Sequence, residues 1–95
     1  MLRDYETIFI VHSELDDEKR IATINKIKET IEKDAQLGDV DEWGMRKLAY
    51  PINYQKEGYY VLVNFKAEPT FIEELERIYR ITDDIIKSIV VKKEA

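Results

Sequence analysis

Alternating apolar and polar residues near the start of the chain predict a β-strand from Arg3 to Val11. Successive side chains of a strand point to opposite faces. The two expected faces carry Tyr5, Thr7, Phe9 and Val11 on one side and Glu6, Ile8 and Ile10 on the other. Both faces hold apolar side chains, so we expect this strand to be central in its sheet.

The next segment changes to helical spacing. Its start is acidic, with Asp16, Asp17 and Glu18, which suits an N-cap and the positive end of the helix dipole. Isoleucines then recur at steps of three, three and four residues, at Ile21, Ile24, Ile27 and Ile31. This spacing predicts that all of them share the buried face of one helix. We expect Gly38 to end this region.

Two further strands are predicted from Val40 to Ile52 and from Tyr59 to Ala67, joined by a short polar loop. Gly44 inside the first of them indicates a bulge or a close backbone approach. A second helix follows Pro69, with an apolar stripe. That stripe consists of Phe71, Leu75 and Ile78, with Ile72 and Tyr79 beside them. Residues 85–91 form the last predicted strand.

The order strand, helix, strand, strand, helix, strand predicts one α+β domain over residues 1–95, a ferredoxin-like βαββαβ sandwich. Its four-stranded antiparallel sheet would carry two helices on one face and leave the other face open. Alternation assigns Ile8, Ile10, Tyr60 and Leu62 to that open face. We interpret this apolar patch as a surface for a partner. The alternatives are that a loop or a tail covers it, or that its apolar residues are tolerated in water.

The composition narrows the functional classes. The 95 residues include no cysteine and carry a formal net charge of −5, which argues against a free-standing nucleic-acid binder. The absence of thiols fits a reducing cytosol. We find no apolar run long enough to cross a bilayer, and no signal peptide. RNA binding would therefore need local basic clusters or a basic partner.

Catalytic chemistry finds little support in the residues. His12 is the only histidine and has no second histidine or cysteine for a metal site. Acylphosphatases share this topology, but the segment from His12 to Asp16 is acidic where they bind an anion. The basic and aromatic signature of the RNA-recognition fold is also missing. We expect no enzymatic activity, no metal and no cofactor.

Positive charges fall into separate groups. The groups considered for phosphate contact are Arg3; Arg46 and Lys47; Arg77, Arg80 and Lys87; and Lys92 and Lys93. Because the first and last strands should be neighbours, Arg3 is expected to lie near the later groups. Contact with phosphate and a solvated surface of scattered cations both remain open.

The segment from Trp43 to Ile52, followed by Gly58 to Val63, closely resembles the bacterial small-subunit ribosomal protein S6 family. The shared features are the glycine, the basic pair, the Leu-Ala-Tyr-Pro-Ile run and the Gly-Tyr-aromatic strand. The similarity extends from Tyr5 to Lys92. It implies a structural protein of the cytoplasmic ribosome that binds the central domain of 16S ribosomal RNA as a heterodimer with the small basic ribosomal protein S18.

Carried over by position, the resemblance implies RNA contact through Arg3, Arg80, Lys87 and Lys92. It implies partner contact through Trp43, Arg46, Lys47, Leu48, Tyr50 and Tyr60, with RNA also possible at the basic pair. Asp4, Thr82 and Ile86 stand where some relatives are basic, which argues against RNA contact there. The competing hypotheses are a small regulatory ligand-binding module of the same fold and a small hydrolase. A further alternative places Leu48 and Tyr50 in the core, with only Trp43 exposed.

Overall fold

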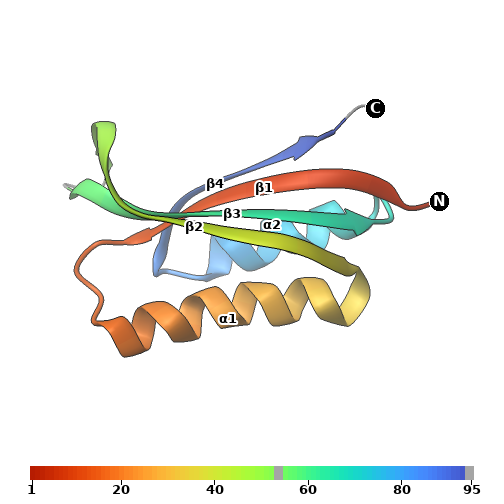
Figure 1. Ribbon diagram of the computed structural model, residues 1–95, viewed down its shortest axis with the longest axis horizontal. Coiled ribbons are helices and arrows are strands. Elements are labelled where there is room, and N and C mark those ends of the chain that lie inside the picture. The colour runs from red at the N-terminus through yellow and green to blue at the C-terminus, as the bar shows by residue number, and fades with distance from the viewer. Residues whose placement is uncertain (53–54, 94–95) are drawn as a thin grey trace.

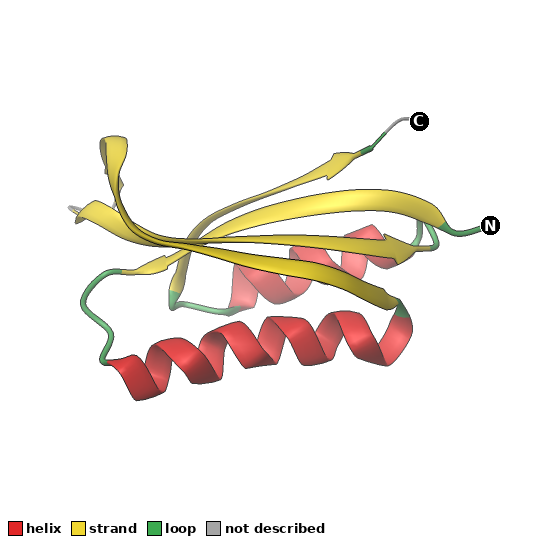
Figure 2. Ribbon diagram, in the orientation of Figure 1, coloured by secondary structure: helices red, strands yellow, loops and turns green. Residues whose placement is uncertain are grey.

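The structure is a computed structural model that describes residues 1–52 and 55–93. Its elements are β1 (Arg3–His12), α1 (Asp17–Asp34), β2 (Gln36–Ile52), β3 (Gln55–Ala67), α2 (Phe71–Ile81) and β4 (Ile85–Lys92). The strands form one antiparallel sheet in the order β2-β3-β1-β4. Both helices cover the same face of this sheet (Figures 1 and 2). The α+β, ferredoxin-like arrangement predicted from the sequence is confirmed.

Strand β1 lies inside the sheet, as its two apolar faces predicted. It pairs with β3 from Arg3↔Ala67 to His12↔Gly58, and with β4 from Tyr5↔Lys92 to Val11↔Ile85. The backbone N–H of Lys93 donates to the Asp4 carbonyl at 2.9 Å, so the end of β4 stays beside the start of β1. Strands β2 and β4 form the two edges.

The core lies between the sheet and the helices. Phe9, Val61 and Val63 are completely buried, as the predicted alternation requires. The helices cover them with residues that recur at helical spacing: Ile24, Ile27 and Ile31 of α1, and Phe71, Leu75 and Tyr79 of α2. The predicted helix-facing sides of β1 and β3 are thus confirmed.

Helix α1 begins as predicted, because the Asp16 side chain accepts a hydrogen bond from the Lys19 backbone N–H at 2.8 Å. The prediction for Ile21 is wrong, since 54% of that residue is exposed. At about 100° per residue, Ile21 lies ~120° around the helix from Ile27. Thr23 is buried instead, and its hydroxyl contacts the Lys19 carbonyl at 3.0 Å and the Asp84 carboxylate at 3.1 Å.

Gly38 does not end the helical region, so that prediction is also wrong. Helix α1 stops at Asp34, and the extended Ala35 donates its N–H to the Ile31 carbonyl at 2.8 Å. No glycine is needed because this cap is not left-handed. Gly38 instead lies within β2, at an irregularity in the pairing between Leu37 and Val40. Strands β2 and β3 both begin earlier than predicted, at Gln36 and Gln55.

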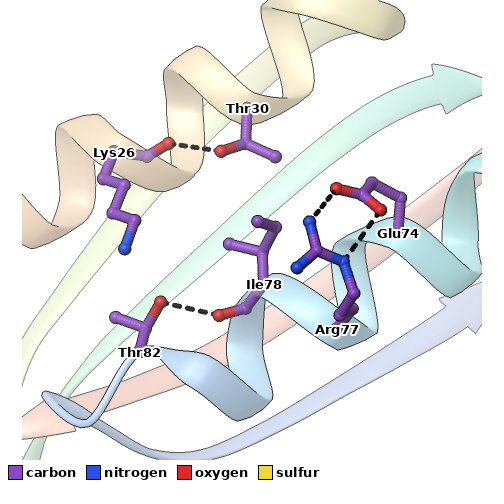
Figure 3. A network of polar contacts seen from close by, with 6 residues as sticks. All are labelled: Lys26, Thr30, Glu74, Arg77, Ile78 and Thr82. Atoms are coloured by element: carbon purple, nitrogen blue, oxygen red, sulfur yellow. Dashed lines mark hydrogen bonds and ion pairs between the residues drawn. The ribbon is translucent and has the colours of Figure 1, made fainter.

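Polar contacts lie along both helices, including the end of α2 (Figure 3). The hydroxyl of Thr82 donates to the Ile78 carbonyl at 2.6 Å, and the Ile85 N–H donates to the Thr82 carbonyl at 3.0 Å, which ties α2 to β4. The Arg77 guanidinium holds the Glu74 carboxylate at 2.6 Å and lowers the pKa of that carboxyl. This ion pair is exposed, so it contributes little to stability.

The β2–β3 hairpin extends past the end of β1, since His12↔Gly58 is the last pair between β1 and β3. Figure 1 shows this end of the hairpin curling away from the helices, over the open side of the sheet. Gly58 sits where the curl starts, and a Cβ there would collide with the Ile10 side chain. The site therefore requires glycine because the Ile10 side chain fills the space that a Cβ would occupy.

Candidate functional site

The open face of the sheet consists of rows of residues that face away from the helices. By register, Ile8 lies between Leu62 and Ile89, and Glu6 lies between Asn64 and Val91. Ile89 and Val91 are 47% and 48% exposed, so apolar surface does remain on this face.

The expectation that Ile10 is exposed is wrong, because only 6% of it is accessible. Its side chain packs against Gly58 of β3, at the base of the curled hairpin. Strands of the sheet itself, rather than a loop or a tail, cover this end of the patch.

A stack of cationic and aromatic side chains rises from β2 at the open face. Gly44 has a φ of +86°, a conformation that favours glycine, and the pairing with β3 shifts between Glu42 and Gly44. The predicted bulge is confirmed. Trp43 stacks on Tyr60 with ring centroids 6.2 Å apart, and the Arg46 guanidinium lies 5.9 Å from the centre of the indole. We refer to Arg46, Trp43 and Tyr60 as the Trp43 stack.

Trp43 and Tyr60 of this stack form one wall of a shallow hollow of about 230 Å³. The hollow is lined mainly by apolar groups, and its residues are Ile8, Ile10, Trp43, Tyr60, Lys87, Ser88 and Ile89. Small-molecule sites usually occupy about 300–1,000 Å³. The hollow is therefore better matched to a single large side chain of a protein partner than to a free ligand.

The end of the hairpin brings two more predicted partner residues to this side. The Lys87 Nζ donates to the Tyr50 hydroxyl at 3.0 Å and lies 5.3 Å from the centre of its ring. Tyr50 is 58% exposed and Leu48 is half-buried, which contradicts the alternative that both belong to the core. Lys47 pairs with Glu57, so alternation points it to the opposite side.

The four candidate RNA residues follow the β4 edge in two groups. Arg80 and Lys87 line a second hollow of about 220 Å³ between α2 and β4. Arg3 pairs with Ala67, and Lys92 pairs with Tyr5, so these two lie near the other end of β4. Lys93 is drawn toward Glu6, with Nζ 3.8 Å from the carboxylate. The structure does not join the four into a single cluster.

Acidic residues accompany the Trp43 stack along β2. The Trp43 indole N–H donates to Asp41 at 3.1 Å, and Glu42 accepts a 2.8 Å hydrogen bond from the Tyr59 hydroxyl on the other face. This bond raises the pKa of Tyr59, and the Arg20 guanidinium covers its ring at 4.6 Å. Carboxylates at this edge would favour cations of a partner.

Sequence reasoning missed two exposed apolar residues of the open face, Ile89 and Val91. The signal was available, because Lys87, Ile89 and Val91 alternate along the last predicted strand. It also missed that Lys87 lines both hollows. The position of Lys87 depends on how β4 packs between α2 and the open face. No local sequence pattern contains that information.

Within residues 1–52 and 55–93, no group of three or more His, Cys, Asp or Glu side chains is placed to hold a metal ion. Neither α1 nor α2 combines the length and apolar character that a membrane-spanning helix requires.

Comparisons with known proteins agree over nearly the whole chain. The family model described as ribosomal protein S6 matches residues 4–92. The small ribosomal subunit protein bS6 of Clostridium novyi (strain NT) is 53% identical over 94 residues, covering 98% of this chain and 99% of that protein. The corresponding protein of Caldanaerobacter subterraneus is 43% identical over the same coverage. The crystal structure of 30S ribosomal protein S6 from Thermotoga maritima aligns with a TM-score of 0.93 at 32% identity, covering 98% of this chain and 89% of that one.

Proposed function

The chain belongs to the ribosomal protein S6 family, and on that premise we propose that it binds the central domain of 16S ribosomal RNA as a heterodimer with the small basic ribosomal protein S18. It is a structural, non-enzymatic protein of the small ribosomal subunit. The proposal concerns its contacts: the open face and the curled hairpin receive the protein partner, and the β4 edge meets RNA.

The Trp43 stack is the observation that carries the partner surface. Trp43 remains 38% exposed although it packs on Tyr60, and the hollow beside it is floored by apolar side chains of β1 and β4. Aromatic and arginine side chains next to an apolar pocket are the usual composition of a binding hot spot. Ile89 and Val91 extend the apolar surface along β4.

Charge supports a basic partner. The net charge is −5, and β2 presents Asp39 and Asp41 near the open face. Complementary charges speed association and exclude acidic proteins. The cations proposed for RNA contact lie elsewhere, along the β4 edge, where Arg80 and Lys87 share a hollow. A basic partner seated on the open face would thus add positive charge next to that edge.

Replacing Trp43 by alanine tests the partner surface. We expect the Kd for purified S18, measured by calorimetry, to rise at least about 30-fold, since hot-spot truncations cost ~2 kcal/mol or more. Ile21→Ala is the matched control, because it removes an exposed apolar side chain from α1 on the opposite side. Circular dichroism would verify that both variants stay folded.

Equal Kd values for the wild type, Trp43→Ala and Ile21→Ala would exclude the open face as the partner surface. Co-sedimentation with small ribosomal subunits tests the larger assignment. A regulatory ligand-binding module of the same fold would remain free of the subunits, and it would bind a small molecule in the absence of S18.

A further inference from the structure

Lys87 occupies the boundary between the two proposed surfaces. On one side it lines the hollow beside Trp43 and Tyr60, and on the other it lines the hollow that contains Arg80. By register it projects from the open face beside Ile10. Among the proposed RNA residues, Lys87 alone contacts a proposed partner residue in the part of the chain that the structure describes, and that residue is Tyr50.

The contact between Tyr50 and Lys87 joins the two edges of the sheet. Tyr50 belongs to β2 and Lys87 to β4, and β3 and β1 lie between those strands. The hairpin must therefore curl over the open face for the two side chains to meet, as its path in Figure 1 shows. A flat hairpin would leave them at opposite sides of the molecule.

The curled hairpin is held at its base. The side chains of Ile10, Leu48 and Ile86 all lie close to the position that a Cβ of Gly58 would occupy. A second contact, in which the Ser13 hydroxyl donates to the side-chain amide oxygen of Gln55 at 2.5 Å, ties the start of β3 to the segment after β1. Packing at the base of the hairpin thus supports the segment that carries Tyr50 and defines its position over β4.

Tyr50 contacts Lys87 in two ways. Its hydroxyl oxygen accepts a hydrogen bond from Nζ at 3.0 Å, and its ring lies 5.3 Å from the same atom. A lysine ammonium has three N–H donors, so this bond leaves two for a phosphate. The flexible four-carbon stem of lysine normally loses much freedom when it binds. Tyr50 removes part of that freedom before RNA arrives.

We propose that Tyr50 is a positioning residue: it orders Lys87 for contact with an RNA phosphate, and a protein seated on the hairpin strengthens RNA binding through this contact. The inference rests on the proposed function. A partner that packs against Tyr50 would restrict the hairpin further and hold Lys87 in place. The coupling is therefore positive, and linkage requires RNA to strengthen partner binding by the same factor.

The test measures RNA affinity with and without S18, using a fragment of the 16S central domain. Tyr50→Phe removes the hydroxyl and keeps the ring. We expect it to reduce the S18-induced gain in RNA affinity by about two- to tenfold, the net contribution of one hydrogen bond. Lys87→Met should weaken RNA binding, and adding Tyr50→Phe to it should change nothing more. Tyr59→Phe is the matched control, since it removes one hydroxyl bond from the other face of the same hairpin.

A spectroscopic measurement isolates the positioning role. The ring of Tyr50 should shift the ε-methylene protons of Lys87 upfield in NMR spectra of the free protein. The shift should decrease in Tyr50→Phe, disappear in Tyr50→Leu and increase when S18 binds. An unshifted signal in the wild type would overturn the inference.

The outcomes separate the inference from the proposed function. If Lys87→Met weakens RNA binding but Tyr50→Phe has no effect, or has the same effect with and without Lys87, the positioning role is overturned and the RNA edge stands. If Lys87→Met leaves RNA binding unchanged while S18 still binds, both the inference and the assignment of Lys87 to the RNA edge fail.

Discussion

At the scale of single residues, the buried hydroxyl of Tyr79 shows how a polar group can be accommodated in a small core. Thr7 donates its proton to the Ile89 carbonyl at 2.8 Å, so the Tyr79 hydroxyl, also 2.8 Å from the Thr7 oxygen, must act as the donor between them. The ring of Tyr79 lies 5.7 Å from that of Phe9. Burial raises the pKa of Tyr79 far above its ordinary value of 10.0.

This pKa shift predicts a loss of stability in alkali. Above about pH 10, the unfolded chain releases the Tyr79 proton while the native protein retains it, so the free energy of unfolding should fall by about 1.4 kcal/mol per pH unit. Below that pH the contribution is constant. Tyr79→Phe should remove this slope, at a cost of about 1 kcal/mol near neutral pH for the lost hydrogen bond.

Urea denaturation between about pH 9 and pH 11.5 measures the slope directly. The control is Tyr50→Phe at an exposed tyrosine, which should retain the wild-type pH dependence. If Tyr79→Phe loses stability in alkali as steeply as the wild type, then another group is responsible.

At the scale of elements, sequence reasoning succeeded where one neighbourhood of the chain decides the outcome. The Asp16 cap, the bulge at Gly44 and the helix-facing residues of β3 each follow from short-range chemistry or from strict alternation. The assignment of Ile21 failed because two consecutive three-residue steps rotate in the same direction around a helix of 3.6 residues per turn. The spacing alone predicts the same burial for all the isoleucines.

The difference between Ile21 and Ile27 gives a stability prediction. Ile27→Ala should lower the free energy of unfolding by about 2–5 kcal/mol, because it leaves a cavity in the core. Leu75→Ala, on α2, should lower the free energy of unfolding by a similar amount. Ile21→Ala should cost less than ~0.5 kcal/mol, as expected for an exposed site. Equal losses for Ile21→Ala and Ile27→Ala in chemical denaturation would contradict the observed face of α1.

The curl of the β2–β3 hairpin could not be predicted from its own residues. The sequence indicates two strands and a polar loop, but Gly58, where the curl starts, packs near Ile10 and Ile86, which come from β1 and β4. In the sequence alone, Gly58 stands out only as part of the resemblance to the S6 family. Its physical role, avoiding a collision with Ile10, becomes apparent once the strands are paired.

At the scale of the whole molecule, the fold was easier to predict than the site. The order of elements and the helix-facing residues follow from periodicity, which the sequence contains. The site combines residues that are distant in the chain, such as Tyr50 with Lys87 and Arg80 with Ser88. Their proximity depends on sheet order and on the curl of the hairpin, so residue types alone could suggest candidates but could not group them.

The distribution of charge leads to a prediction about assembly. Twenty acidic residues and a net charge of −5 oppose a polyanion, while the proposed RNA residues occupy one edge. Each phosphate that a cation neutralises adds about 0.9 to the salt slope on duplex nucleic acid. Arg3, Arg80, Lys87 and Lys92 therefore supply at most ~4 such contacts. We expect the isolated chain to bind its RNA site weakly, and S18 and RNA to bind cooperatively.

Arg80→Ala is the sharpest variant for this prediction, and Arg77→Ala is its matched control on the same helix. The Arg77 side chain is occupied by Glu74 through two hydrogen bonds, of 2.6 and 3.1 Å. Titrations of the S18–RNA complex at several salt concentrations should show that Arg80→Ala lowers the salt slope by about 0.7–0.9 and that Arg77→Ala does not. Neither change should unfold the protein, because both residues are exposed. Nanomolar binding of RNA by the chain alone at physiological salt, unchanged by S18, would show that assembly is not cooperative and that the acidic charge does not oppose RNA binding.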